Sequence, residues 1–311
     1  MSMMTICASH SPLAATTGPA IGPEYRTSLK RVAKLIDDFK PDLLVEFAPD
    51  HYNGFFYDMM PNFCVGVAAS SVGDWGTSSG PLEVPKDAAL AIAQAARASD
   101  IDVDLSYRMQ VDHGFTQILD MMFEGITKYP IVPIMINCTG APLPSFRRAR
   151  LLGEAVGRHL LGTGKRVVIL GSGGLSHDPP LPQLEKAAEP QLEFLMAGRN
   201  PSAEARNARV RRVMDAAERF VAGDSPCLAP SPKWDHEFTQ MLARGSIDDV
   251  DSWKDEEISS VGGSGAHEVR TWIAALAAQS MSGSYDVKVE YYEVVREWLT
   301  GMCVMTAAQR T

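Results

Sequence analysis

Long apolar runs are missing from this sequence. No stretch of its 311 residues approaches the roughly 18–20 continuous apolar residues that a membrane-spanning helix requires. The first residues are apolar, but the run is short and no basic residue precedes Arg26, so we interpret them as a β-strand and not as a signal peptide. We therefore expect a soluble protein that has no membrane partner.

Basic residues are also few in comparison with acidic ones. The chain has 29 lysines and arginines against 38 acidic residues, which gives a formal net charge of -9. Nucleic-acid affinity depends chiefly on clustered basic side chains that neutralise phosphates. We therefore expect no nucleic-acid partner.

Cysteine is scarce and shows no pairing pattern. The five cysteines are Cys7, Cys64, Cys138, Cys227 and Cys303. Their number is odd, they are widely spaced, and no C-x-x-C motif occurs, which indicates a reducing compartment. We expect a cytoplasmic protein in which most of these cysteines are buried as small apolar residues.

Two common catalytic signatures are absent as well. No G-x-S-x-G motif surrounds Ser172 or Ser264, so the sequence does not support serine-hydrolase chemistry. The glycine-rich GSGG segment is followed by no lysine and opens no helix, which argues against a phosphate-binding loop. We expect instead that its glycines let the backbone pass close to a ligand and aim His177.

The sequence does contain an alternation of strands and helices. Short apolar and β-branched runs predict strands at 3–8, 42–48, 63–69, 131–137 and 166–171, while apolar residues three and four apart predict helices at 24–39, 87–98 and 147–161. After residue 180, helical patterns at 184–196, 203–221, 236–242 and 267–281 follow without intervening strands. We predict an α/β fold in which helices flank a central sheet, with a mainly helical C-terminal third.

Histidines follow several of these strands. His10, His51 and His177 each come a few residues after an apolar strand, and His113 follows a weaker strand candidate at 103–109. Because ligands of open α/β sheets bind where the carboxyl ends of parallel strands meet, we expect the four imidazoles to gather at one site. His159, inside an amphipathic helix, and His236, near a helix start, are interpreted as structural.

A metal at this site would need more than two imidazoles, and non-haem iron sites typically add a carboxylate. The residues alone leave four candidates open: Asp50, Asp112, Glu46 and Glu268. Asp50 and Asp112 each precede a histidine directly, so they are equally suited to orienting a ring through its second nitrogen. Glu268 follows a glycine-rich turn at a helix start, which could bring it to the sheet edge.

Five motifs in order, ASHSPL, FAPDHYNGFFYDMMP, QVDHGF, LGSGGLSHDPP and HEVRTW, resemble those of the class III extradiol ring-cleavage dioxygenases. The resemblance covers almost the whole chain and implies a single LigB-like domain over residues 1–311. It also implies an Fe(II) cofactor, with His10, His51 and Glu268 as the metal ligands and open positions left on the iron.

The same resemblance implies that His113 and His177 are the acid–base pair. His177 would take a proton from the bound catechol, and His113 would donate one to the departing oxygen. Three further residues lie within the motifs around the histidines and would help to hold the histidines in position. They are Asp112, Asp50 and Pro179.

The implied partners are O2 and a catechol that carries a propionate side chain, as in 3-(2,3-dihydroxyphenyl)propionate, and we expect a homo-oligomer. A cation should bind the propionate. The sequence offers Arg108, Arg147, Arg148 and Arg270 without favouring one of them.

Two other functions use the same residues. A metal-dependent hydrolase could hold zinc with these histidines, and a non-catalytic binding protein could share the scaffold. Metal analysis and a dependence on oxygen distinguish these alternatives from a dioxygenase.

Overall fold

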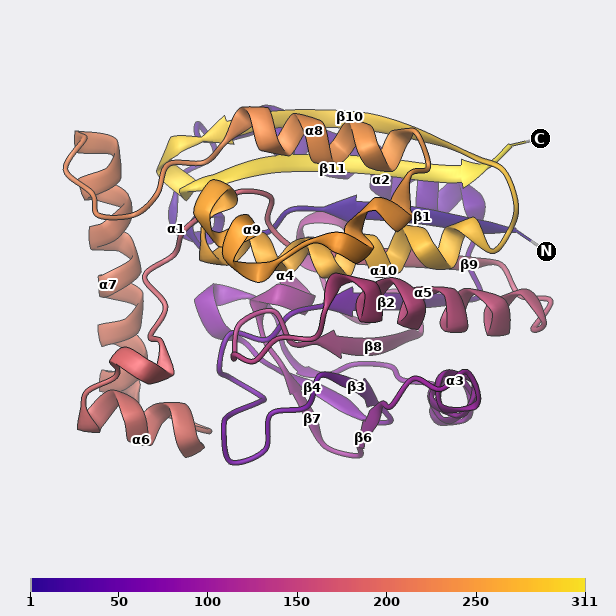
Figure 1. Cartoon of the computed structure of the whole chain (residues 1–311), viewed down its shortest axis with the longest axis horizontal. Helices are drawn as coiled ribbons and strands as arrows, with labels where there is room; N and C mark the ends of the chain where they lie inside the picture. The colour runs from indigo at the N-terminus through magenta and orange to yellow at the C-terminus, as the bar shows by residue number, and fades with distance from the viewer. Residues whose placement is uncertain (1, 311) are drawn as a thin grey trace.

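An eight-stranded mixed sheet forms the centre of the computed structural model, which describes residues 2–310 (Figure 1). In sheet order its strands are β10 (Tyr285–Val295), β11 (Thr300–Gln309), β1 (Met3–Ala8), β9 (Val167–Ser172), β2 (Leu43–Ala48), β8 (Ile131–Ile136), β3 (Phe63–Gly66) and β6 (Asp104–Ser106). The four middle strands, β1, β9, β2 and β8, are parallel to one another. Their carboxyl ends therefore open on one edge of the sheet.

These middle strands are apolar along nearly their whole length because both faces of the sheet are covered. Every residue of β1, β2, β8 and β9 is buried. Continuous apolar runs are typical of parallel strands packed between two layers of helices.

The helices cover both faces of the sheet and one end of the molecule (Figure 1). They are α1 (Leu13–Thr16), α2 (Pro23–Phe39), α3 (Lys86–Ala98), α4 (His113–Phe123), α5 (Phe146–Leu161), α6 (Glu189–Ala197), α7 (Ala203–Ala222), α8 (Pro232–Ala243), α9 (Asp255–Gly262) and α10 (Val269–Ser280). Short 3-10 turns are η1 (Asp74–Gly76), η2 (Leu184–Lys186), η3 (Ile247–Ser252), η4 (Ser264–Glu268) and η5 (Arg296–Trp298). Helices α3, α5, α8 and α10 pack on one face of the sheet, and α2 and α4 pack on the other.

Helix α10 lies unusually close to α5. A Cβ atom at Gly153 or Gly157 of α5 would collide with the backbone of Ala274 or Ala278 of α10. Only glycine permits this approach of two backbones. The contact holds α10 against the sheet and so brings η4, which immediately precedes it, to the carboxyl edge.

A second, three-stranded sheet has the order β5 (Ser79–Pro81), β4 (Ala69–Val72), β7 (Met109–Val111). The single strand predicted at 103–109 is wrong: β6 and β7 belong to different sheets, and the exposed residues Tyr107 and Arg108 form the bend between them. The chain then runs from β7 directly into α4.

The predicted fold class and most of the predicted elements are confirmed. The fold is α/β, with helices in the C-terminal part, and each strand predicted before residue 180 other than 103–109 forms close to its expected place. Four of the five cysteines are buried, and all five are free thiols. Within residues 2–310, no helix combines the length and the apolar character that crossing a bilayer requires.

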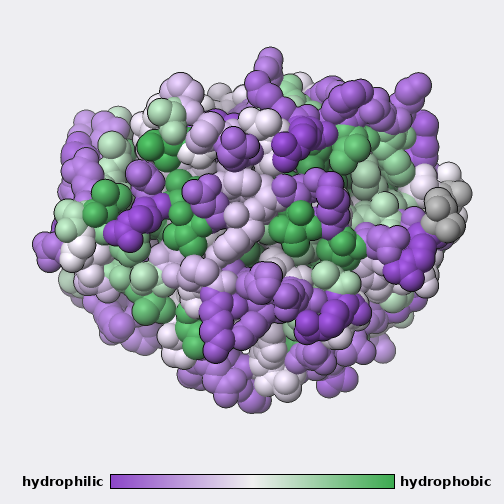
Figure 2. Space-filling model, turned by 90° about the horizontal axis from the view of Figure 1, so that it is seen from above, coloured by the Kyte–Doolittle hydropathy of each residue, from purple (hydrophilic) through white to green (hydrophobic). Residues whose placement is uncertain are grey.

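The last two strands, β10 and β11, go beyond the prediction of a mainly helical C-terminal third. β11 pairs with β1, and β10 closes that side of the sheet. The edge strand β10 carries Lys288, Glu290 and Glu293 among its apolar residues, which is typical of edges that avoid pairing with other chains. Figure 2 shows the surface on this side, where hydrophilic residues interrupt the hydrophobic ones.

Glu46 lies in the core and away from the sheet edge. It is fully buried in the middle of β2, and neither carboxylate oxygen has a hydrogen-bond partner within the described residues. By strand alternation it shares a face with Leu44 and Ala48, which pack beneath α2 and α4. Burial raises the pKa of Glu46 well above its usual value, so it is a protonated acid in the folded chain.

Replacing Glu46 with leucine should therefore stabilise the protein. The unfolded chain loses this proton above about pH 4.3, but the folded chain keeps it to a higher pH, so the wild-type free energy of unfolding falls as the pH rises through this window. We expect Glu46→Leu to add about 1–3 kcal/mol at pH 8 and less at pH 5, measured by urea denaturation. Glu256→Leu on the exposed surface of α9 is the control, and a loss of stability in Glu46→Leu at pH 8 contradicts the prediction.

Candidate active site

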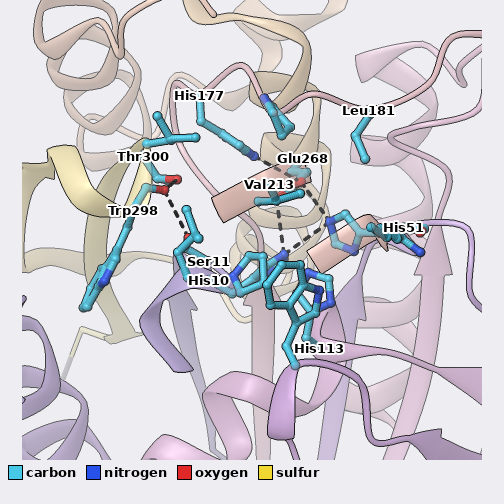
Figure 3. Close-up of a pocket in the computed structure, with 16 residues that line it drawn as sticks. His10, Ser11, His51, His113, His177, Leu181, Val213, Glu268, Trp298 and Thr300 are labelled. Atoms are coloured by element: carbon cyan, nitrogen blue, oxygen red, sulfur yellow. Dashed lines mark hydrogen bonds and ion pairs between the residues drawn. The ribbon is translucent and has the colours of Figure 1, made fainter. Parts of the chain in front are cut away.

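Two histidines and one glutamate meet at the carboxyl edge of the parallel strands. His10 follows β1, His51 follows β2, and Glu268 ends η4. The Nε2 atoms of the two histidines are 3.5 Å apart, and they lie 3.6 Å and 3.2 Å from the two oxygens of Glu268. Figure 3 shows the three side chains pointing toward one another. All three are buried.

This arrangement fits a divalent metal ion. Ligand atoms about 2.1 Å from a metal and on one face of its coordination sphere are separated by about 3 Å, close to the spacing seen here. Two imidazoles and a carboxylate on one face leave further positions open, a donor set typical of non-haem Fe(II) oxygenases. Of the four carboxylates left open by the sequence, only Glu268 contacts both His10 and His51.

The protonation states of His10 and Glu268 suit metal binding, whereas that of His51 opposes it. Burial lowers the pKa of His10 to about 3, even though Glu268 opposes the shift, so this imidazole is neutral. Burial by itself would raise the pKa of Glu268, but His177 and His10 hold it well below its usual value, so the carboxylate is ionised. For His51, burial lowers the pKa, but Asp112 and Glu268 outweigh it and raise the pKa above the usual value. A metal would therefore compete with a proton for His51.

Asp112 holds the ring of His51 in place. Its Oδ2 accepts from the backbone N–H of His51 at 2.8 Å and lies 3.2 Å from Nδ1 of the same residue. Its Oδ1 accepts from Gly114 N at 2.9 Å and thereby caps α4. A carboxylate behind the second nitrogen is how proteins commonly orient a metal-binding histidine. His10 is held through its Nδ1, which lies 3.1 Å from Ser172 Oγ.

Asp50 shapes the loop that follows His51. Its carboxylate accepts hydrogen bonds from the backbone N–H groups of Asn53, Gly54 and Phe55 and contacts no histidine ring. Burial and the nearby charge of Asp112 raise its pKa to about 7. Asp50 therefore supports the site through the backbone.

His113 lies beside the metal-binding set at the first position of α4. Its backbone N–H donates to Asp74 Oδ1 at 2.8 Å, and its Nδ1 lies 2.6 Å from Asp74 Oδ2. The ring stacks on that of His51 with centroids 4.4 Å apart. Asp74, in the turn after β4, was not predicted, because nothing in its sequence context links it to His113.

His177 faces the same cavity from the loop after β9. Its Nδ1 lies 3.0 Å from the carbonyl oxygen of Leu175, which can only accept, so Nδ1 carries a proton and Nε2 is the nitrogen that gains or loses one. Nε2 lies 3.4 Å from Glu268. Burial lowers the pKa of His177, but Glu268 outweighs it and the net shift is upward. A Cβ at Gly174 or Gly265 would collide with this ring, which confirms that a glycine of the GSGG segment makes room for it.

The cavity enclosed by these residues has a volume of about 60 Å³, and Pro179, Trp75 and Arg209 also line it. A second cavity of about 580 Å³ adjoins it and shares Trp75 and Arg209 with it. His159 in α5 and His236 in α8 line neither cavity, as expected for structural residues.

The four arginines considered for a substrate carboxylate face elsewhere. Arg270 is buried against Pro144 O and Asp255, Arg147 and Arg148 pair with acids beside α5, and Arg108 lies in an exposed bend. None of them lines either cavity. The arginine that lines both cavities is Arg209, on helix α7, whose sequence pattern resembles that of any exposed, charged helix.

Comparison with known proteins places this geometry in a family context. Residues 4–302 match the family described as the catalytic LigB subunit of aromatic ring-opening dioxygenase. Three similar proteins carry the name 2,3-dihydroxyphenylpropionate/2,3-dihydroxicinnamic acid 1,2-dioxygenase. That of Paraburkholderia phymatum is 48% identical over 98% of this chain and 97% of its own. That of Rhodococcus jostii is 48% identical over 96% of both chains, and that of Azotobacter vinelandii is 45% identical over 100% of both.

Replacing Asp112 with asparagine should weaken metal binding and leave the fold intact. Asparagine caps a helix as well as aspartate does, but it removes the charge behind His51. We expect about 10–100-fold weaker binding of a divalent metal, measured by titration of the metal-free protein. Asp120→Asn, in the same helix and bonded to Ser78 N, is the control. An unchanged metal affinity in Asp112→Asn would contradict the assignment of Asp112 as the residue that orients His51.

Proposed function

The chain belongs to the family of the catalytic LigB subunit of aromatic ring-opening dioxygenases, and from this premise we propose that it opens the catechol ring of 3-(2,3-dihydroxyphenyl)propionate with O2. The full-length similarity to enzymes named for this substrate and for 2,3-dihydroxycinnamate supports the choice. Cleavage beside the diol places both oxygen atoms in a 2-hydroxy-6-oxonona-2,4-dienedioate, so no further reductant is needed.

The observation that carries the proposal is the set formed by His10, His51 and Glu268. We propose that these three residues hold Fe(II) on one face. Iron bound there would supply the Lewis-acid and redox chemistry that couples a catecholate to O2. The protein contributes a buried cavity and holds both histidine ligands through a second contact, from Asp112 to His51 and from Ser172 to His10.

We assign the proton transfers to the two remaining histidines. His177 lines the cavity and its Nδ1 proton is directed at Leu175 O, so in its neutral form the residue would take a proton from a catechol hydroxyl on Nε2. His113, oriented by Asp74, is the second imidazole in the cavity outside the metal set and would donate the proton to the departing oxygen. Pro179, in the cavity wall, follows His177 closely and limits the path of that loop.

A zinc hydrolase is the second candidate, because ring nitrogens of His10, His51 and His113 all lie within 4.8 Å of one another. Three histidines and a water are typical of some catalytic zinc sites. The Glu268 contacts and the family membership favour the dioxygenase.

Three further properties belong to the proposal. Residues 1–311 would form one domain, since β1 and β11 pair in one sheet and the family match spans 4–302. The free thiols support a reducing, cytoplasmic location. We also propose that the chain works as a homo-oligomer.

Oxygen uptake tests the function directly. Protein loaded anaerobically with Fe(II) should, on addition of O2 and 3-(2,3-dihydroxyphenyl)propionate, consume oxygen and form a yellow ring-opened product. Zinc-loaded protein should do neither. A colourless sample and constant oxygen in the iron-loaded protein would overturn the proposal, and ester hydrolysis by the zinc form alone would favour the second candidate.

Removing either proton-transfer histidine should abolish turnover without loss of iron. We expect His113→Ala and His177→Ala each to lower kcat by about 10²–10⁴-fold, the range for loss of a general acid or base. The control is His236→Ala, which is exposed on α8. Iron loss from either variant, measured by metal analysis, would instead make that histidine a ligand.

A further inference from the structure

Three arginines of α7 line the larger cavity beside the active site. Arg206, Arg209 and Arg212 are three residues apart, which puts them along one face of the helix, and all three border the cavity of about 580 Å³. Figure 1 shows α7 standing at the end of the molecule toward which β1 runs, and Figure 3 places Val213 of this helix over the histidines.

The positive charge of this face is not neutralised. Among residues 2–310, none of the three arginines forms an ion pair, whereas their neighbours Arg199 and Arg219 pair with acids. The only acidic residue that lines this cavity is Asp74, and its carboxylate is bonded to His113. Partial burial and the nearby charge of Arg209 lower the pKa of Arg212. The cavity therefore favours an anion.

Arg209 links the two cavities. It lines both, and Trp75 is the other residue that they share. Its guanidinium donates to the carbonyl oxygens of His51 and Tyr52 and to Asn53 Oδ1, and these contacts use Nη1 and Nη2. An arginine has five N–H donors, so Nε and one N–H of Nη2 remain for a ligand.

We propose that Arg209 binds the side-chain carboxylate of the substrate, with Arg206 and Arg212 adding positive charge around it. The inference rests on the proposed function: with the ring among the histidines, a chain at carbon 3 that passes Trp75 and Arg209 enters the larger cavity. Paired N–H donors of an arginine match a carboxylate in geometry as well as charge. The α7 face would thus select catechols with an anionic side chain.

The competing interpretation is that Arg209 only positions the loop of His51. Two substrates separate the two roles, because 3-propylcatechol has a side chain of similar size to propionate but no charge. A positioning residue affects both substrates equally. A carboxylate-binding residue affects only 3-(2,3-dihydroxyphenyl)propionate.

The experiment measures kcat/KM of iron-loaded wild type, Arg209→Gln and Arg212→Gln with both catechols. We expect Arg209→Gln to lose about 10–100-fold with the propionate, mainly through KM, and to stay within about threefold of wild type with 3-propylcatechol. Arg212→Gln should show the same selectivity with a smaller loss. The matched control is Arg211→Gln on the same helix, because Arg211 is exposed and lines neither cavity. An equal loss on both substrates, or no loss on either, overturns the proposal.

Binding of 3-phenylpropionate keeps this inference separate from the proposed function. This molecule carries the carboxylate but no catechol oxygens, so its affinity by calorimetry needs no turnover. Weaker binding to Arg209→Gln than to wild type and Arg211→Gln supports the carboxylate site even if no ring is opened. Equal affinities, or no binding to the wild type, contradict it.

Discussion

The ionised carboxylate of Glu268 is buried among imidazoles, and the site depends on how its charge is satisfied. It contacts His10, His51 and His177 and accepts a hydrogen bond from Gly174 N at 2.7 Å. A buried charge is costly unless it is paired and hydrogen-bonded, so these partners must be held where the carboxylate can reach them. The three histidines follow β1, β2 and β9, while Glu268 ends η4 just before α10. The side chain of Glu268 therefore connects a late segment of the chain to the ends of strands formed earlier in the sequence.

The group that contacts Nδ1 of each imidazole fixes the orientation of that ring. A carboxylate contacts Nδ1 of His51 and another contacts Nδ1 of His113, whereas a backbone carbonyl contacts Nδ1 of His177 and leaves Nε2 as the nitrogen that gains or loses a proton. Four side chains of one type can thus be divided between holding a metal and moving protons, because each ring is oriented by a different neighbour.

The loop after His51 connects this chemistry to the larger cavity. Asp50 accepts a hydrogen bond from the backbone of this loop, and Asp112 accepts one from the side chain of Asn53. Arg209 donates to the carbonyl oxygens of the same loop. A substrate carboxylate bound at Arg209 would lie against the same loop that positions a metal ligand. In this proposal, adjoining groups would recognise the substrate charge and position the metal ligand.

The sequence by itself determined the α/β class, the middle strands and the placing of His10, His51 and His177 after strand ends, because apolar runs and their periodicity are local properties. It also contained the motifs that resemble ring-opening dioxygenases. The resemblance named Glu268, and the tertiary structure showed that Glu268, and not Asp50, Asp112 or Glu46, contacts both His10 and His51. It likewise revealed Asp74 behind His113 and Arg209 in the cavity wall. These contacts join residues 39 to 258 positions apart, and such pairings depend on how helices and strands pack, which no local pattern records.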